Sequence, residues 1–299
     1  MSIVSMTTLL DKARKEHYAV GYFESFNMDS LLGVLDAAEE YHSPVIIGFG
    51  GQFLSSEKRD RIDSIFPYGV MAREAAKYAS VPVAVLLNES NREDMIYQAM
   101  NAGFNAVMYQ KPGEDIDETL RITKEICKIA HMLNIDVESE IGELPNADIS
   151  TGTRSTGFCT DIEIAVNFAK STGVDALAVS VGNIHLLENG KASIDFDLLT
   201  KLSNHIRVPL VLHGGTGISS EDLQKAISKG ICKVNVGTAL KRGYINAVGR
   251  FYKEINLDQT NPHVTIGWGG ENDMISAGRK AISKKTSEFM KIFGSVGKA

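Results

Sequence analysis

The sequence of 299 residues lacks the features that mark several classes of protein. Its three cysteines (Cys127, Cys159 and Cys232) are scattered and do not have the spacing of a zinc finger. No apolar run is long enough to span a bilayer, and no signal-peptide pattern of charged, apolar and small residues opens the chain. We therefore expect a reduced, cytoplasmic protein without a disulfide framework.

The chain also has fewer positively charged than negatively charged residues. The chain has 31 lysines and arginines against 37 aspartates and glutamates, which gives a net charge of -6. This balance argues against nucleic acid or an anionic membrane as the main partner. No low-complexity tract, linker or shift in composition divides the chain. We therefore expect a single domain over residues 1–299, with a C-terminal helical extension at about 273–293.

Eight short apolar runs alternate with helix-like stretches, and each run has the length and continuity of a buried strand. The runs are Tyr18–Phe23, Pro44–Gly48, Pro82–Leu87, Ala106–Tyr109, Ile135–Ile141, Ala176–Val181, Val208–Leu212 and Ile231–Val236. This order predicts an α/β fold of the (β/α)8 TIM-barrel type. A doubly wound open sheet is the alternative. It would have fewer strands and a Gly-x-Gly-x-x-Gly turn after the first strand, and that turn is absent.

The end of the seventh run has the strongest functional signal. His213 follows the apolar residues directly, and Gly214, Gly215, Thr216 and Gly217 come next. Glycines let the backbone turn tightly and bring its N–H groups close to a ligand. This arrangement suits an anion held beside a metal or a reacting carbonyl. A tight strand-to-helix turn with an incidental histidine is the alternative interpretation.

Polar residues also end most of the other predicted strands, and barrel enzymes build their sites at these ends. The set comprises Glu24, Asn88, Glu89, Gln110, Glu138, Asn183, His185, His213, Asn235 and Thr238. Glu138 and Glu140 lie on one face of the fifth strand by its period of two. Two histidines and several carboxylates at one rim predict a divalent metal site. The alternative is that both histidines are neutral, hydrogen-bonded core residues.

Two glycine-containing loops follow the last two predicted strands, where barrels often hold phosphate groups. We expect an anion to contact residues from both loops, from the end of the sixth strand and from the following helix. The predicted contacts are Gly182, Asn183, Gly214, Gly215, Thr216, Asn235, Gly237, Thr238 and Lys241.

Several stretches together resemble the class II, metal-dependent fructose-bisphosphate and tagatose-bisphosphate aldolase family over essentially the whole chain. Val137–Gly142 is one of them, and four others are specific in combination: Gly182–His185, Val211–Gly217, Lys233–Asn235 and the closing Phe293–Ala299. The resemblance implies a barrel, usually dimeric or tetrameric, that binds a ketose phosphate beside a divalent metal. In that family, the metal stabilises the enediolate formed by cleavage of a carbon–carbon bond.

The departures from the family pattern lie at the centre of the site. The family ends strand three with Leu-Asp-His, where the aspartate is the acid/base and the histidine is a metal ligand. This chain has Asn88 and Glu89 at those positions, and Glu24 replaces the family's asparagine after strand one. An amide cannot accept and return a proton, which costs about 10²–10⁴ in rate where a positioned acid/base is lost. The family's Asn-x-Asp-Thr loop has become Asn235–Thr238, with Gly237 in place of the aspartate.

We interpret the chain as a divergent aldolase in which Glu24 and Asn88 occupy the catalytic positions. Glu89, His185 and His213 are the predicted metal ligands, and Glu138 is a fourth because it matches a metal-binding glutamate of the family. Zinc is the first candidate, with manganese, iron or cobalt as alternatives. A sugar-phosphate epimerase or isomerase, and a degenerate barrel that binds a sugar phosphate without turnover, remain alternative functions. A homodimer or homotetramer is expected.

Overall fold

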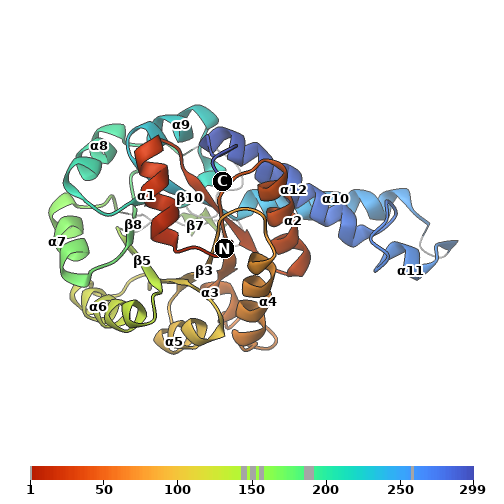
Figure 1. Ribbon diagram of the computed structural model, residues 1–299, viewed down its shortest axis with the longest axis horizontal. Coiled ribbons are helices and arrows are strands. Elements are labelled where there is room, and N and C mark those ends of the chain that lie inside the picture. Colours follow the sequence, from red (N-terminus) through yellow and green to blue (C-terminus); the bar gives the residue numbers. More distant parts are fainter. Residues whose placement is uncertain (1, 143–146, 149–152, 155–157, 185–191, 257–258) are drawn as a thin grey trace.

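The computed structural model describes all residues except 1, 143–146, 149–152, 155–157, 185–191 and 257–258. Eight parallel strands form a closed barrel in the order β1-β10-β9-β8-β5-β4-β3-β2 (Figure 1). They are β1 (Val20–Ser25), β2 (Val45–Gly50), β3 (Val83–Ser90), β4 (Ala106–Tyr109), β5 (Asp136–Ile141), β8 (Ala176–Val179), β9 (Leu210–Leu212) and β10 (Ile231–Val236). Each strand falls at one of the eight predicted runs, so the TIM-barrel prediction is confirmed.

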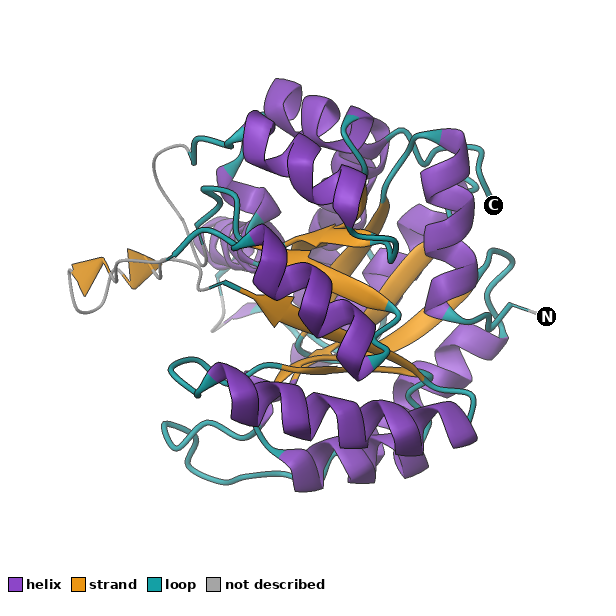
Figure 2. Cartoon of the chain, turned by 90° about the vertical axis from the view of Figure 1, so that its left-hand side faces the viewer, coloured by secondary structure: helices purple, strands orange, loops and turns teal. Residues whose placement is uncertain are grey.

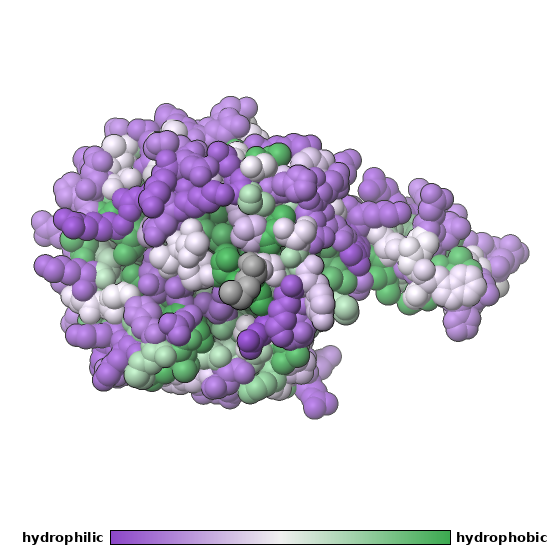
Figure 3. All heavy atoms as spheres, viewed as in Figure 1, coloured by the Kyte–Doolittle hydropathy of each residue, from purple (hydrophilic) through white to green (hydrophobic). Residues whose placement is uncertain are grey.

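Helices cover the outside of the barrel. They are α2 (Met28–Glu40), α4 (Phe66–Lys77), α5 (Glu93–Ala102), α6 (Ile116–Met132), α7 (Ile162–Thr172), α8 (Phe196–His205), α9 (Ser220–Ser228) and α10 (Thr238–Glu254), with the short α3 (Gly51–Leu54) after β2. Their apolar faces pack on the outward-facing side chains of the strands and form one continuous core. Hydrophilic residues cover much of the face shown in Figure 3. Among the described residues, no helix combines the length and apolar character needed to cross a bilayer.

A second core fills the barrel interior. Tyr22, Ile46, Leu86 and Met108 are buried there. An N-terminal helix, α1 (Met6–Glu16), packs its apolar face against the same cluster and closes the amino end of the barrel. The sequence analysis did not anticipate this helix. Because one end is plugged, the polar carboxyl ends of the strands are left as the place for a site.

Two features extend from the barrel. Helices α10 and α12 (Met274–Phe293) pack side by side, and α12 also packs against α2; the far ends of the two helices extend beyond the barrel, with α11 (Pro262–Thr265) near the tip (Figure 1). The strands β6 (Ala147–Asp148) and β7 (Thr153–Arg154) pair as a small antiparallel sheet beyond the barrel, at the left of Figure 2.

Gly48 marks a point where the barrel wall requires glycine. Its φ is +154°, and a Cβ built there would lie 1.8 Å from the backbone oxygen of Leu86 on the neighbouring strand. That oxygen belongs to the paired strand backbone and cannot move without breaking the β2–β3 ladder. An alanine therefore has no low-energy placement at this position.

We predict that Gly48→Ala lowers the free energy of unfolding by more than about 3 kcal/mol, because neither the backbone angle nor the space suits a side chain. Urea denaturation followed by circular dichroism measures this loss. Gly249→Ala is the matched control, since Gly249 lies within α10 and a Cβ there meets no atom within 4 Å. The control should gain about 0.5–1 kcal/mol. Equal effects of the two substitutions would contradict this account.

Candidate active site

His213 lies at the centre of the polar rim. It follows β9 directly and is 1% exposed. Its Nε2 is 3.1 Å from Glu138 Oε1 on β5. Its Nδ1 is 3.2 Å from Glu89 Oε1 and 3.1 Å from Glu140 Oε2. One imidazole ring is therefore surrounded by three carboxylates from two other strands.

These carboxylates determine the protonation of the ring when no metal ion is bound. Burial alone would lower the pKa of His213, but the side-chain hydrogen bonds with Glu138, Glu140 and Glu89 outweigh it and raise that pKa well above its usual value. Nδ1 can carry only one proton, although two carboxylates approach it. A cation at Nδ1 would satisfy both.

The backbone at the end of β3 explains how Glu89 reaches this ring. Successive side chains of a regular strand point to opposite faces, so Asn88 and Glu89 should diverge. Glu89 instead has a φ of +48°, and the β3–β4 register shifts between Leu87 and Ser90. Because the backbone at Glu89 is left-handed, the consecutive side chains of Asn88 and Glu89 both lie at the carboxyl-end rim of the barrel. The Nε2 atom of Gln52 donates a hydrogen bond to Glu89 Oε2 and helps to hold the carboxylate in place.

Glu138 belongs to a buried ion pair inside the barrel. Lys233 Nζ on β10 is 2.8 Å from Glu138 Oε2 and 3.0 Å from Oε1, and both side chains are fully buried. Burial would raise the pKa of Glu138, but the Lys233 charge and the hydrogen bonds with His213 and Lys233 hold it below its usual value. Burial lowers the pKa of Lys233, and Glu138 opposes that effect.

A second ion pair lies at the end of β1. Lys241 Nζ on α10 is 2.5 Å from Glu24 Oε1 and also lies 3.9 Å from the centre of the Phe53 ring. A Cβ at Gly237 would lie 2.9 Å from Glu24 Oε2. The glycine in this loop therefore makes room for the Glu24 carboxylate beside the first turn of α10.

The two glycine loops meet at the start of α10. Gly214 has a φ of +70°, and a Cβ there would lie 2.3 Å from the Ile184 backbone oxygen. A single-turn 3-10 helix, η1 (Gly215–Gly217), follows it. Thr216 Oγ1 accepts a hydrogen bond from Ala239 N, which joins this loop to the α10 N-terminus. Amides of a helix N-terminus beside such a loop can bind an anion.

Asn183 and Gly182, which were predicted to contact an anion, lie against backbone groups of the protein instead. The Asn183 side chain bonds backbone groups only: Oδ1 accepts from Val181 N, and Nδ2 donates to His213 O at 3.1 Å and to Val179 O. This geometry favours a role in positioning His213 over contact with substrate. Gly182 precedes Asn183 in the same turn, and a Cβ there would lie 2.1 Å from the Ser193 backbone oxygen.

The predicted metal ligands do not all meet at one atom of the ring. Glu138 lies on the Nε2 side of His213, away from Glu89. His185 lies outside the described residues.

Three residues of this cluster were given no role from the sequence: Glu140, Lys233 and Gln52. Glu140 had a signal, because it shares the inward face of β5 with Glu138. Lys233 also had one, since a lysine within an apolar strand must find a buried partner. Nothing in the sequence pointed to Gln52.

The side chains at Nδ1 are compatible with a divalent cation. Glu89 and Glu140 both direct a carboxylate oxygen at Nδ1 of His213, so two oxygens and one nitrogen of metal-ligating type lie close together. Glu140 Oε1 is buried and accepts no hydrogen bond from any described residue. No group of three His, Cys, Asp or Glu side chains within the described ranges is already at metal-binding geometry. Donor atoms 3.1–3.2 Å apart are nevertheless spaced as neighbouring ligands of one ion with bonds of about 2.0–2.2 Å.

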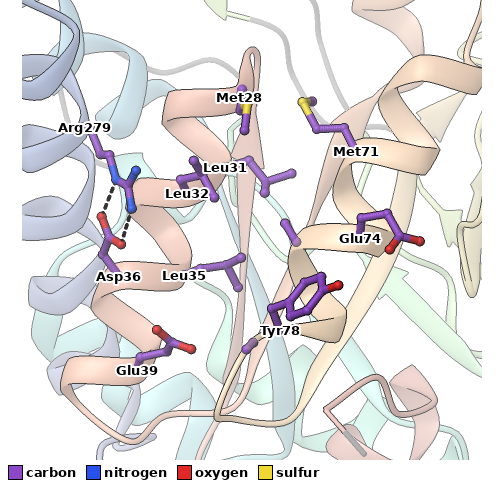
Figure 4. Close-up of a pocket in the computed structure, with 12 residues that line it drawn as sticks. Met28, Leu31, Leu32, Leu35, Asp36, Glu39, Met71, Glu74, Tyr78 and Arg279 are labelled. Carbon is purple, nitrogen blue, oxygen red and sulfur yellow. Dashed lines mark hydrogen bonds and ion pairs between the residues drawn. The ribbon is translucent and has the colours of Figure 1, made fainter. Parts of the chain in front are cut away.

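A groove on the outer surface of the barrel lies between α2 and α4. It is lined by apolar residues such as Leu31, Leu35 and Met71, with the Asp36–Arg279 ion pair at one side (Figure 4). These helices belong to the outer layer, and the groove contains none of the strand-end residues. It is therefore separate from the candidate active site.

Comparison with known proteins identifies the family of the chain. Residues 4–298 match the family model described as fructose-bisphosphate aldolase class-II. The chain belongs to this class II aldolase family. It is 36% identical to the uncharacterized protein YdjI of Escherichia coli K12, over 96% of each chain. It is 31% identical to the sulfofructosephosphate aldolase of Alkalicoccus urumqiensis, over 100% of this chain and 99% of that one.

The crystal structure of the YdjI aldolase superposes on this aldolase-family chain with a TM-score of 0.82, over 99% of both chains at 33% identity. The fructose-bisphosphate aldolase of Thermus caldophilus is 31% identical over 99% of this chain and 100% of its own. These matches confirm the resemblance found in the sequence and extend over its whole length.

The buried ion pair generates a stability prediction. We expect Lys233→Met and Glu138→Leu each to lower the free energy of unfolding by about 3–5 kcal/mol, because each leaves an uncompensated buried charge. The double variant should lose much less than the sum of the two. Urea unfolding of the four proteins measures the coupling. Glu288→Gln, at the exposed Lys285 pair, is the control and should leave the midpoint unchanged. Additive losses would show that the pair is not coupled.

Proposed function

We propose that this protein is a divalent-metal-dependent aldolase that cleaves a phosphorylated ketose. The observation that carries the proposal is the convergence of Glu89 and Glu140 on Nδ1 of His213, beside glycine loops suited to an anion. Membership of the aldolase family supports it. So do the names of two relatives, one a fructose-bisphosphate aldolase and the other a sulfofructosephosphate aldolase, since both specify phosphorylated ketoses.

In this proposal Glu89, Glu140 and His213 hold the metal, and His185 remains a further predicted ligand. Glu140 takes the position first assigned to Glu138, because Glu140 lies on the same side of the ring as Glu89. Zinc remains the first candidate, with manganese, iron and cobalt as alternatives. When bound, such an ion stabilises the negative charge that develops on a substrate carbonyl oxygen.

The remaining steps are assigned to the protein's own side chains. Backbone amides at Gly214–Gly217 and at the start of α10 bind the substrate phosphate, and Lys241 adds positive charge beside them. Glu24 is the proposed proton acceptor, because Asn88 has no ionisable group and Glu24 lies at the same loop as Gly237. Lys241 orients the Glu24 carboxylate in the absence of substrate.

The projecting arm formed by α10, α11 and α12 supports the expected homodimer or homotetramer. Several large apolar side chains on it are exposed, among them Ile245, Tyr252 and Trp268. Exposed apolar side chains of this size are typical of surfaces that contact another protein.

The proposal predicts that the zinc-loaded protein cleaves at least one member of a panel of ketose phosphates: the 1-phosphates and 1,6-bisphosphates of fructose and tagatose, and sulfofructose 1-phosphate. Turnover of fructose 1,6-bisphosphate should be below about 1 s⁻¹, the low end of ordinary enzymes. Coupled assays detect released triose phosphate, and ¹³C NMR detects isomerised ketose. Removal of metal by a chelator should abolish cleavage, and zinc should restore it.

Two variants distinguish the metal ligands from their neighbours. Glu140→Gln should lose most of its bound zinc by elemental analysis and most of its activity, because a carboxamide is a poor ligand for this ion. Glu125→Gln, on the exposed face of α6, is the control and should keep both. Full zinc occupancy in Glu140→Gln would contradict the assigned ligand set, and isomerisation without cleavage would favour the epimerase or isomerase alternative.

A further inference from the structure

A chain of hydrogen bonds connects the buried ion pair to Asn88. Lys233 Nζ lies 2.6 Å from Asn235 Oδ1, in addition to the two oxygens of Glu138. Asn235 Nδ2 lies 3.2 Å from Asn88 Oδ1. All four side chains are buried. The chain runs across the barrel from β5 through β10 to β3.

The direction of this chain follows from the chemistry of its first member. Lys233 Nζ lies within 3.0 Å of three oxygen atoms, which match the three N–H bonds of an ammonium group. An ammonium group donates and cannot accept, so the Asn235 atom that faces it must be the carbonyl oxygen. The amide nitrogen of Asn235 then faces Asn88, and the Asn88 atom that accepts from it must also be an oxygen. This assignment does not depend on how either amide was placed.

Asn88 is therefore left with its Nδ2 group for any further contact. Among the described residues, none accepts a hydrogen bond from that nitrogen. Asn88 precedes Glu89, whose carboxylate reaches His213, and the left-handed backbone at Glu89 brings both residues to the same rim of the barrel. A side chain fixed in this way presents donors to a ligand and no acceptor.

We propose that Asn88 donates a hydrogen bond through Nδ2 to an oxygen of the bound substrate, and that Lys233 is the positioning residue that sets this polarity through Asn235. The inference rests on the proposed function, because it requires a substrate oxygen beside the metal. It assigns Asn88 a binding role that an ionised carboxylate at this position could not have. An aspartate here could accept from Asn235 equally well but would present an oxygen to the substrate.

The test compares two substitutions of nearly equal size. Asn88→Asp replaces the donor group by an acceptor and adds a negative charge, and the uncharged Asn88→Leu removes donor and acceptor together. The probe is dihydroxyacetone phosphate, the three-carbon ketone phosphate that cleavage of a 1-phosphorylated ketose releases. We expect its Kd, measured by calorimetry with the zinc-loaded proteins, to rise more than tenfold in Asn88→Leu and at least as much in Asn88→Asp. Zinc content, measured in parallel, should not fall in either.

A second readout follows the donor group itself. In ¹⁵N-labelled protein, the side-chain amide signal assigned by its loss in Asn88→Asp should shift when the probe is added. In Asn235→Asp, where residue 235 can no longer donate, Asn88 should turn its nitrogen toward that residue, and the signal should no longer respond. A structural role for Asn88 would not produce this loss of response.

The outcomes separate the two proposals. Binding of the probe to Asn88→Asp as tightly as to wild type, or an amide signal that does not respond in wild type, overturns the donor role and leaves the proposed function intact. Failure of the zinc-loaded wild type to bind the probe at all overturns the proposed function and the donor role together.

Discussion

The contact between Lys233 and Glu138 inside the barrel determines how the polar rim above it is arranged. Two buried opposite charges are tolerated only when each is matched and further hydrogen bonds satisfy the remaining atoms. Glu138 meets this requirement by accepting from His213, and Lys233 by donating to Asn235. The ion pair therefore orients the His213 ring, which follows β9, and the Asn235 side-chain amide on β10.

The orientation of the His213 ring determines which carboxylates face each of its nitrogens. With Nε2 directed at Glu138, Nδ1 of His213 faces Glu89 and Glu140. Glu89 reaches this place only through a left-handed backbone at the end of β3. Such strain persists where the surrounding structure determines it, and it occurs preferentially at functional sites. A divalent cation would balance two carboxylates around a neutral imidazole, which is why the geometry supports metal chemistry at this position.

The barrel could be predicted from the sequence because its strands are buried on both faces. Such strands give continuous apolar runs, and eight of them separated by helices leave few possible arrangements. Helix α1 was missed because a helix that plugs the barrel has no counterpart in the repeating strand–helix pattern. Its apolar residues Met6, Leu9 and Leu10 gave the only signal.

The expectation that a barrel site lies at the carboxyl ends of the strands named most of the polar residues that the structure brings together there, but it could not assign their partners. Period two placed Glu138 and Glu140 on one face, yet the side of the ring that each meets depends on the tilt and register of β5 against β9. Asn183 has the composition of a binding residue, and only its bonds to backbone groups show that it holds the turn beside His213. The direction of the amides of Asn235 and Asn88 likewise required the position of Lys233.

In the proposed site, Glu138 holds a proton of His213 on Nε2, and Nδ1 of the same ring binds the metal. Long-range ¹H–¹⁵N NMR of histidine-labelled protein, titrated with zinc, tests it most directly, with the His213 signals identified by their absence in His213→Asn. We expect Nε2 to stay protonated throughout, while Nδ1 loses its proton and its signal shifts as zinc binds. Retention of the proton on Nδ1 at zinc saturation, or loss of the proton from Nε2, would contradict it.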